Sequence, residues 1–187
     1  FSAVELMPVA AFAGRWNWGY DGVLLYAPDS AYGRPEHLKA LIDAAHARNL
    51  MVFLDVVYNH FGPEGNFLGR YAPEFFTKAS TPWGSAIDYR IPQVRACAVQ
   101  NALHWLENYR FDGLRLDAVH AILDHSAQPF LEDLALALRA RGEELNRRIY
   151  SIAESALNDT RVIRTRELGG FGIDAQWNDD FHHTLRV

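Results

Sequence analysis

The chain has 187 residues, of which 49% are hydrophobic, 13% aromatic and 22% charged. These proportions are typical of a globular protein, and they exclude a disordered tail, a collagen-like fibre and a low-complexity linker. The formal charge of −5, from 23 acidic and 18 basic residues, gives no support to nucleic-acid binding. The sequence has no apolar run near the ~18 residues that cross a bilayer, so we expect no membrane partner. The single cysteine, Cys97, excludes an internal disulfide.

The start of the chain bears on its location in the cell. The first residues carry no basic segment before an apolar stretch, so they do not resemble a signal peptide, and we expect a cytoplasmic protein. The chain begins with Phe1 rather than Met, which suggests that part of a gene product precedes it. The place where a leader would stand is therefore expected to lie outside this sequence.

Apolar periodicity predicts strands and amphipathic helices that alternate along the chain. Residues 35–48 carry the i, i+3, i+4, i+7 stripe of a helix, and Pro35 suits its first turn. Residues 50–57 are nearly all apolar, as expected of a strand buried on both faces of a parallel sheet. In chain order we expect a strand at 3–9, a helix at 35–48, a strand at 50–57, a helix at 92–109, a strand at 111–118, a helix at 129–141 that ends at Gly142, a strand at 149–153, a helix capped by Asn158 or Asp159 that runs through Ile163, and a strand at 171–177.

This alternation of strand and helix is typical of a parallel α/β fold. The long connections, residues 10–34 and 58–89, follow strands, and in a (β/α)₈ barrel such loops carry the active site. A doubly wound sheet has the same pattern, but no Gly-rich phosphate fingerprint follows any strand. We therefore predict one domain over residues 1–187 with an α/β fold that forms part of a (β/α)₈ TIM barrel.

Charged residues stand where the predicted strands end. Asp55, Asp117 and Glu154 each close an apolar run, and a buried carboxylate is costly unless it is paired or functional. Arg115 lies two residues before Asp117, so both face the same side of a strand, and an arginine there holds the carboxylate ionised and oriented. Two carboxyls ~5–5.5 Å apart across a cleft are what a retaining glycosidase needs. A buried ion pair and a helix-capping acid would give the same spacing.

Three short motifs resemble conserved regions of the α-amylase superfamily, glycoside hydrolase family 13. They are residues 55–60 (DVVYNH), 113–120 (GLRLDAVH) and 152–154 (IAE), in the order that the superfamily has them. The resemblance implies that Asp117 is the nucleophile and Glu154 the general acid/base. It also implies that Arg115 orients the carboxylate of Asp117, and that Asp55 supports the site through Arg115.

The resemblance extends to residues that would bind sugar. It implies that His60 and Tyr20 contact the sugar next to the cleaved bond, with Tyr20 as an aromatic platform. Aromatic rings stack well on the apolar faces of pyranoses, so we also expect Trp18 and Trp83, in strand-end loops, to contact sugar. No cofactor is expected. Asn59 matches a calcium ligand of many amylases, but the rest of that calcium site is not recognisable.

The sequence departs from the superfamily in two places. His120, which we expect to contact substrate, and the following Ala121 stand where many amylases have Lys-His, so the subsites for the leaving sugars are expected to differ. The fourth conserved region has no match, and the third catalytic carboxylate is expected beyond Val187. His182 and His183 beside two aspartates suggest a metal site, but adjacent histidines point in different directions and no metal is predicted.

Within the superfamily, several stretches resemble the trehalohydrolases. Those enzymes hydrolyse the α-1,4 bond between a maltooligosaccharide and a terminal trehalose, so the expected substrate is a maltooligosyltrehalose or a maltooligosaccharide. A 1,4-α-glucan branching enzyme and a non-catalytic amylase-like binding protein remain as alternatives. The stretches are residues 4–9, 18–23, 58–66, 81–84 and 177–183.

The length sets a further expectation. Five predicted strands fall short of the eight strands and ~250 residues of a closed barrel. The resemblance places them as the second to sixth strands, so the barrel is expected to be incomplete at both ends. Such a piece exposes two sheet edges, and we expect it to be poorly soluble or unfolded alone.

Overall fold

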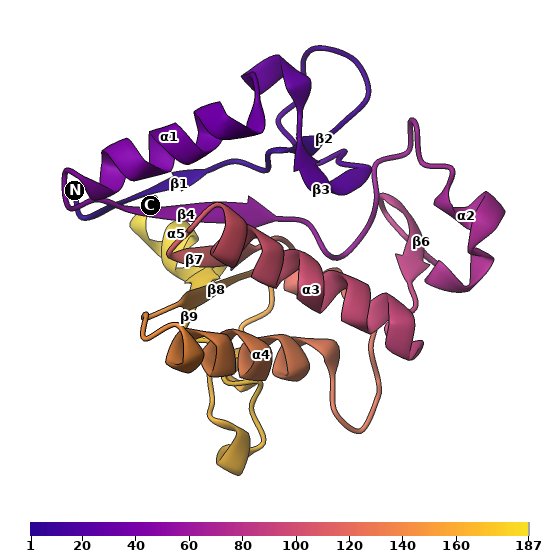
Figure 1. The fold of residues 1–187 in the computed structure, drawn as a ribbon. Helices are drawn as coiled ribbons and strands as arrows, with labels where there is room; N and C mark the ends of the chain where they lie inside the picture. The colour runs from indigo at the N-terminus through magenta and orange to yellow at the C-terminus, as the bar shows by residue number, and fades with distance from the viewer. Residues whose placement is uncertain (187) are drawn as a thin grey trace.

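The computed structural model describes residues 1–186 and is built around a parallel sheet of five strands (Figure 1). All neighbouring strands are parallel, and their spatial order is the order of the chain. A doubly wound sheet would reverse its order at a switch point. The prediction of a partial (β/α)₈ barrel is therefore confirmed, as an open half-barrel. Its strands are β1 (Ala3–Leu6), β4 (Met51–Val56), β7 (Gly113–Leu116), β8 (Tyr150–Ser155) and β9 (Ala175–Asn178).

Three long helices cover the outer face of this sheet (Figure 1). The predicted helices at 35–48 and 92–109 are confirmed as α1 (Pro35–His46) and α3 (Pro92–Asn108), and α4 (Phe130–Glu144) follows β7. Both α1 and α3 have proline in the first turn, where its missing N–H costs no hydrogen bond.

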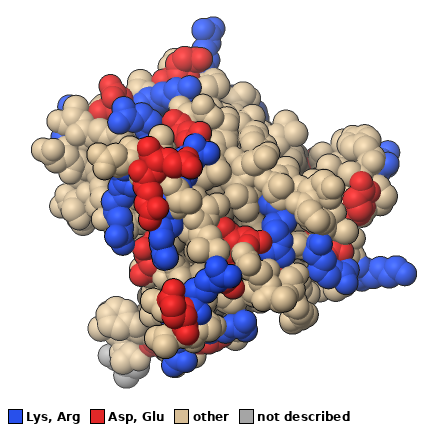
Figure 2. Space-filling view, turned by 60° about the horizontal axis from the view of Figure 1, so that its bottom comes forward, with Lys and Arg blue, Asp and Glu red and all other residues tan. Residues whose placement is uncertain are grey.

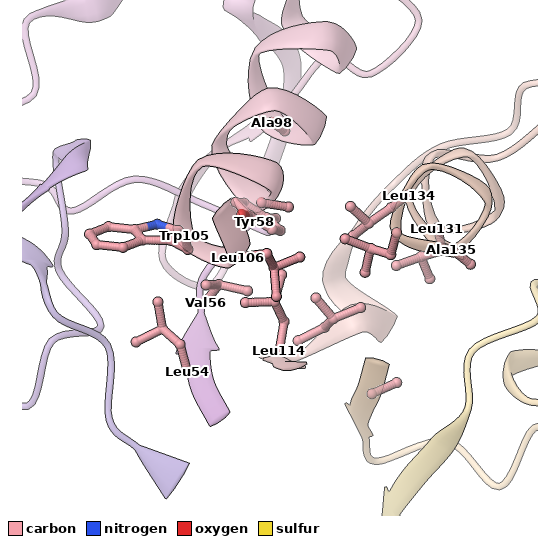
Figure 3. Close-up of a cluster of buried hydrophobic side chains, with 14 of the residues drawn as sticks. Leu54, Val56, Tyr58, Ala98, Trp105, Leu106, Leu114, Leu131, Leu134 and Ala135 are labelled. Carbon is pink, nitrogen blue, oxygen red and sulfur yellow. The ribbon is translucent and has the colours of Figure 1, made fainter. Parts of the chain in front are cut away.

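The hydrophobic core lies between the sheet and these helices (Figure 3). Alternate residues of β4 and β7, such as Leu54 and Leu114, are fully buried against Trp105 and Leu106 of α3 and Leu134 of α4. Burial of a large apolar side chain contributes about 1.5–3 kcal/mol. Because side chains alternate along a strand, packing of this set on the helices sends the intervening residues to the inner face.

The inner face below the strand ends is filled by two aromatic rings. Phe53 of β4 and Tyr150 of β8 pack edge to face, with ring centroids 6.0 Å apart. Gly113 of β7 lies between them, and a Cβ there would come within 2.4 Å of the Tyr150 carbonyl oxygen and 2.5 Å of the Phe53 ring. Glycine at this position therefore lets both rings close over β7.

The two long connections contain more structure than the sequence predicts. In the first, β2 (Ala10–Ala11) pairs antiparallel with β3 (Leu24–Pro28). In the second, the helical turn α2 (Leu68–Tyr71) precedes a hairpin of β5 (Phe76–Thr81) and β6 (Gly84–Ile87). Both small sheets lie beyond the carboxyl ends of the main strands. Short 3-10 helices span Ser30–Tyr32, Pro73–Phe75, Val119–Ala121, Thr160–Val162 and Arg166–Leu168.

Several predicted boundaries in the second half of the chain are wrong. Helix α4 does not end at Gly142 but continues to Glu144. Gly142 lies inside the helix, at a point where a Cβ would come within 2.8 Å of the Arg147 carbonyl oxygen. The helix expected after Asp159 is a single 3-10 turn, in which the Asp159 side chain accepts from the Arg161 N–H. The last strand, β9, begins at Ala175 rather than 171, since Gly172 has a φ of 74° and turns the chain.

A last helix, α5 (Asp179–Leu185), was not predicted. The Asn178 side chain caps it by accepting a hydrogen bond from the Asp180 N–H. Among residues 1–186, no helix has the length and apolarity needed to span a membrane. On the face shown in Figure 2, acidic and basic side chains are interspersed rather than gathered by sign.

Candidate active site

Four charged side chains converge on the inner face, at the carboxyl ends of three neighbouring strands. Asp55 of β4 and Arg115 of β7 are direct register partners. Asp117 lies two residues beyond Arg115, and Glu154 lies near the end of β8, next to β7. All four follow the alternation that sends their outer neighbours into the core. The structure therefore brings together the residues that the sequence singled out at three strand ends.

Arg115 is the centre of this group. Its Nη1 donates to both carboxylate oxygens of Asp55, at 2.9 and 2.8 Å, and to Oδ1 of Asp117 at 2.8 Å. Its Nη2 lies 3.8 Å from Oε2 of Glu154. Burial alone would lower the pKa of Arg115, which is 8% exposed, but Asp55 and then Asp117 raise it above its usual range. One guanidinium thus faces three carboxylates.

Asp55 is the most deeply buried of these acids, at 2% exposed. The hydroxyl of Tyr20 donates to its Oδ2 at 2.8 Å, in addition to the two bonds from Arg115. Burial raises the pKa of Asp55 to about 6, although Arg115 and Tyr20 favour the ionised form. Asp55 is therefore charged at neutral pH and loses that charge in mild acid.

The second oxygen of Asp117 is held by Asn59. The Asn59 side-chain nitrogen donates to Oδ2 and to the backbone oxygen of Asp117, both at 2.9 Å. With Arg115 on Oδ1, both carboxylate oxygens of the predicted nucleophile have a donor. The sequence pointed to Asn59 only as a calcium ligand and missed this contact. Within residues 1–186, no three His, Cys, Asp or Glu side chains are grouped to hold a metal ion.

Glu154 is tied to the peptide that follows Asp117. Its Oε2 accepts a hydrogen bond from the Ala118 N–H at 2.7 Å. Ala118 has φ 41° and ψ 51°, a left-handed conformation that is uncommon for any residue but glycine. Such backbone outliers cluster at functional sites. The turn directs the N–H after Asp117 toward Glu154, so the two carboxyl groups are linked through one peptide unit.

His60 and Trp83 form an aromatic wall next to this group. The His60 Nε2–H donates to the Tyr20 carbonyl oxygen at 3.0 Å, and the Asn59 side-chain oxygen lies against Nδ1. Burial lowers the pKa of His60, while the Tyr20 carbonyl opposes this shift. The Trp83 ring stacks on His60 with centroids 5.3 Å apart and planes 20° apart, and it stays 44% exposed. An exposed ring face beside the carboxylates suits stacking on a sugar.

The other predicted substrate contacts lie farther out. Trp18 is 77% exposed, in the connection between β2 and β3 two residues before Tyr20. His120 lies in the 3-10 turn after Asp117, and its Nδ1 accepts from the Ala156 N–H at 3.3 Å. His120 thereby joins the loop that follows β7 to the loop that follows β8.

Sequence reasoning missed Trp177 as a site residue. Trp177 on β9 is the register partner of Glu154, and its ring centroid lies 5.6 Å from the guanidinium carbon of Arg115. A cation above an aromatic face is attracted to it. The available signal was its position near the end of the last predicted strand, as for the three acids. His182 and His183, considered above as metal ligands, lie instead on the exposed α5.

Comparison with known proteins places this geometry in a family. Residues 1–81 match the family model of the alpha-amylase catalytic domain. The chain is 49% identical over 188 residues to a malto-oligosyltrehalose trehalohydrolase of Arthrobacter ramosus, with 99% of this chain and 33% of the relative covered. It is 33% identical over 211 residues to the 1,4-alpha-glucan branching enzyme GlgB of Mycobacterium bovis, with 98% and 28% covered.

A solved structure gives the same result. A crystal structure from Salmonella typhimurium, described as a candidate alpha amylase, superposes with a TM-score of 0.89 at 47% identity, covering 100% of this chain and 32% of that one. The chain spans about a third of the length of the curated relatives it matches. Similarity along the whole chain, the half-barrel and the motifs at its strand ends identify it as a partial catalytic domain of the α-amylase superfamily, glycoside hydrolase family 13.

Proposed function

We propose that this chain carries part of the active site of a retaining glycoside hydrolase that releases trehalose from maltooligosyltrehalose. The observation that carries the proposal is the arrangement of Asp117 and Glu154. Arg115 and Asn59 donate hydrogen bonds to the Asp117 carboxylate, and the Ala118 N–H donates one to Glu154. The substrate is inferred from relatives named malto-oligosyltrehalose trehalohydrolase, which are 45–49% identical to this chain over nearly all of it.

In the first step, Asp117 attacks the anomeric carbon of the sugar. A bond forms between a carboxylate oxygen of Asp117 and that carbon, and the bond to the leaving oxygen breaks as Glu154 gives it a proton. The hydrogen bonds to both oxygens of Asp117 fix the plane of the carboxylate. The pairing of Arg115 with Asp55 keeps the guanidinium in place for this task.

In the second step, water releases the sugar from the enzyme. Glu154, now ionised, takes a proton from a water molecule, whose oxygen bonds to the anomeric carbon while the bond to Asp117 breaks. Two inversions at the same carbon retain its configuration. His60 and Tyr20 contact the sugar at the cleaved bond, and the exposed face of Trp83 stacks on it.

The nucleophile is tested by Asp117→Asn in the complete gene product. The amide keeps the size of the carboxylate but cannot attack, so release of trehalose from maltooligosyltrehalose is expected to fall by at least about 10³-fold. Product chromatography measures the loss, and circular dichroism shows whether the fold is kept. A correctly folded variant with near-normal turnover would refute the assignment.

The two alternative functions are separated by their products. A branching enzyme forms α-1,6 bonds on amylose, which proton NMR detects, whereas the proposed hydrolase releases free trehalose from maltooligosyltrehalose. A binding protein does neither. The identity to the branching enzyme, 33%, is lower than that to the trehalohydrolases. Trehalose release without new α-1,6 signals is the expected result.

A further inference from the structure

Trp177 lies beside the guanidinium of Arg115 on the inner face of the sheet. It is the register partner of Glu154, and register partners on neighbouring parallel strands point to the same face. The guanidinium carbon of Arg115 lies over the Trp177 ring, 5.6 Å from its centroid. The ring therefore stands on the face that carries the three carboxylates, in contact with the one cation that faces all of them.

Hydrogen bonds hold this guanidinium through a single nitrogen. Nη1 of Arg115 donates to Asp55 and Asp117. Nη2 lies 3.8 Å from Oε2 of Glu154, which is beyond the ordinary distance of a hydrogen bond. Nε is buried, and it has no hydrogen-bond partner among residues 1–186. The hydrogen bonds thus fix where Nη1 lies, but they do not fix the plane of the whole group.

The Trp177 ring supplies the missing restraint. The negative face of an aromatic ring attracts a cation, most strongly for tryptophan, and the attraction is larger where water has been removed from the cation. Arg115 meets this condition, since it is 8% exposed. A planar guanidinium also stacks on aromatic faces. The ring therefore acts on the part of Arg115 that the carboxylates leave unpaired.

We propose that Trp177 is a positioning residue that acts through Arg115. By holding the guanidinium, the ring keeps Nη1 directed at the Asp117 carboxylate and Nη2 close to Glu154. The inference rests on the proposed function, and it adds to the three strand-end motifs a residue of β9. In this role Trp177 affects the orientation of the nucleophile and not the binding of sugar.

Trp177→Leu in the complete protein tests this role, because leucine is apolar but has no ring face. The kcat for trehalose release from maltooligosyltrehalose is expected to fall about 10–30-fold, as for loss of a cation–π contact at a buried cation. KM is expected to change less than about threefold, since ground-state binding is kept. Trp177→Phe restores a ring and is expected to stay within about fivefold of the wild type. Circular dichroism checks the fold, and Trp177→Met replaces the leucine variant where that variant is unfolded.

A second substrate separates this role from contact with the leaving sugar. In α-glucosyl fluoride the leaving group needs no proton from Glu154, yet Asp117 still attacks. Trp177→Leu is therefore expected to lower kcat/KM for fluoride release by the same 10–30-fold. Gln176→Ala is the matched control on β9, because Gln176 points to the opposite face and donates to the Leu157 carbonyl oxygen at 3.1 Å. It is expected to change either activity less than about threefold.

The outcomes separate this inference from the function on which it rests. A fall in kcat that Trp177→Phe restores, with fluoride release affected alike and Gln176→Ala unchanged, supports it. A rise in KM at unchanged kcat would show that Trp177 binds sugar, and a loss confined to trehalose release would show that it serves the leaving group. Either result, an unchanged kcat, or an equal loss in Gln176→Ala overturns the inference while trehalose release by the wild type upholds the proposed function. A wild type that releases neither product contradicts the proposed function, and the inference falls with it.

Discussion

At the scale of single residues, one nitrogen of Arg115 positions two of the three carboxylates of the site. Nη1 donates to Asp55 and to Asp117, so the state of one acid affects the donor that serves the other. Because the pKa of Asp55 is about 6, the pairing changes within an accessible pH range.

A pH dependence follows from Asp55. As the pH falls through about 6, Asp55 takes up a proton and its pairing with Arg115 weakens, so kcat/KM of the complete enzyme is expected to fall on this acidic limb. Asp55→Asn is expected to be less active throughout and to lack that limb. A limb near pH 6 that persists unchanged in Asp55→Asn would show that another group causes it.

The same shift has a consequence for stability. Folding raises the pKa of Asp55 from 3.8 to about 6, so the folded chain holds an extra proton between these values. This contribution to stability is complete below about pH 3.8 and is lost as the pH rises through about 6. Asp55→Asn is expected to remove it, so in the complete protein the melting temperature of the variant should vary less than that of the wild type between pH 4 and 6.

At the scale of elements, the site depends on strands that pack apolar side chains on one face and present charged side chains on the other. Leu54 and Leu114 face the helices, while Asp55 and Arg115 face inward. This division was predictable, because apolar runs that end in charged residues mark buried strands with polar ends. The Asn59–Asp117 contact was not, since it depends on how the chain turns after β4. The position of Trp177 was obscured because β9 starts four residues later than predicted.

Gly113 tests how closely these strands must approach. Gly113→Ala would place a Cβ 2.4 Å from the Tyr150 carbonyl oxygen, so β7 and β8 must separate. We expect the complete protein to lose about 1–3 kcal/mol of stability, measured by denaturant unfolding. Gly69→Ala is the control, since its Cβ would meet the Phe76 ring at an ordinary 3.6 Å. Equal stability of the two variants would contradict the packing described for Phe53 and Tyr150.

At the scale of the whole molecule, the sheet is open. β1 and β9 are its edge strands and each has one neighbour. An unpaired edge exposes backbone donors and acceptors, and in a closed barrel every strand has two neighbours. The inner face also leaves Trp177 52% exposed. The outer face of the sheet packs against the helices, whereas the edge strands β1 and β9 on either side of the site each lack a neighbour.

The 187-residue chain alone is therefore expected to be poorly soluble and to unfold without a sharp transition. The reason is that both edge strands leave backbone donors and acceptors unpaired. Circular dichroism during heating, with sedimentation to detect aggregates, measures both properties. A soluble monomer with a sharp, reversible transition would show that the half-barrel is a stable unit.

The left-handed turn at Ala118 has a consequence for how such an enzyme can diversify. Because a single peptide joins Asp117 to the hydrogen bond on Glu154, the spacing of the two acids is set inside the barrel and not by the long loops above it. Insertions and substitutions in those loops can alter which sugar is accepted while the reacting groups keep their places. Bond cleavage and substrate choice are thus properties of different parts of the chain, free to change at different rates.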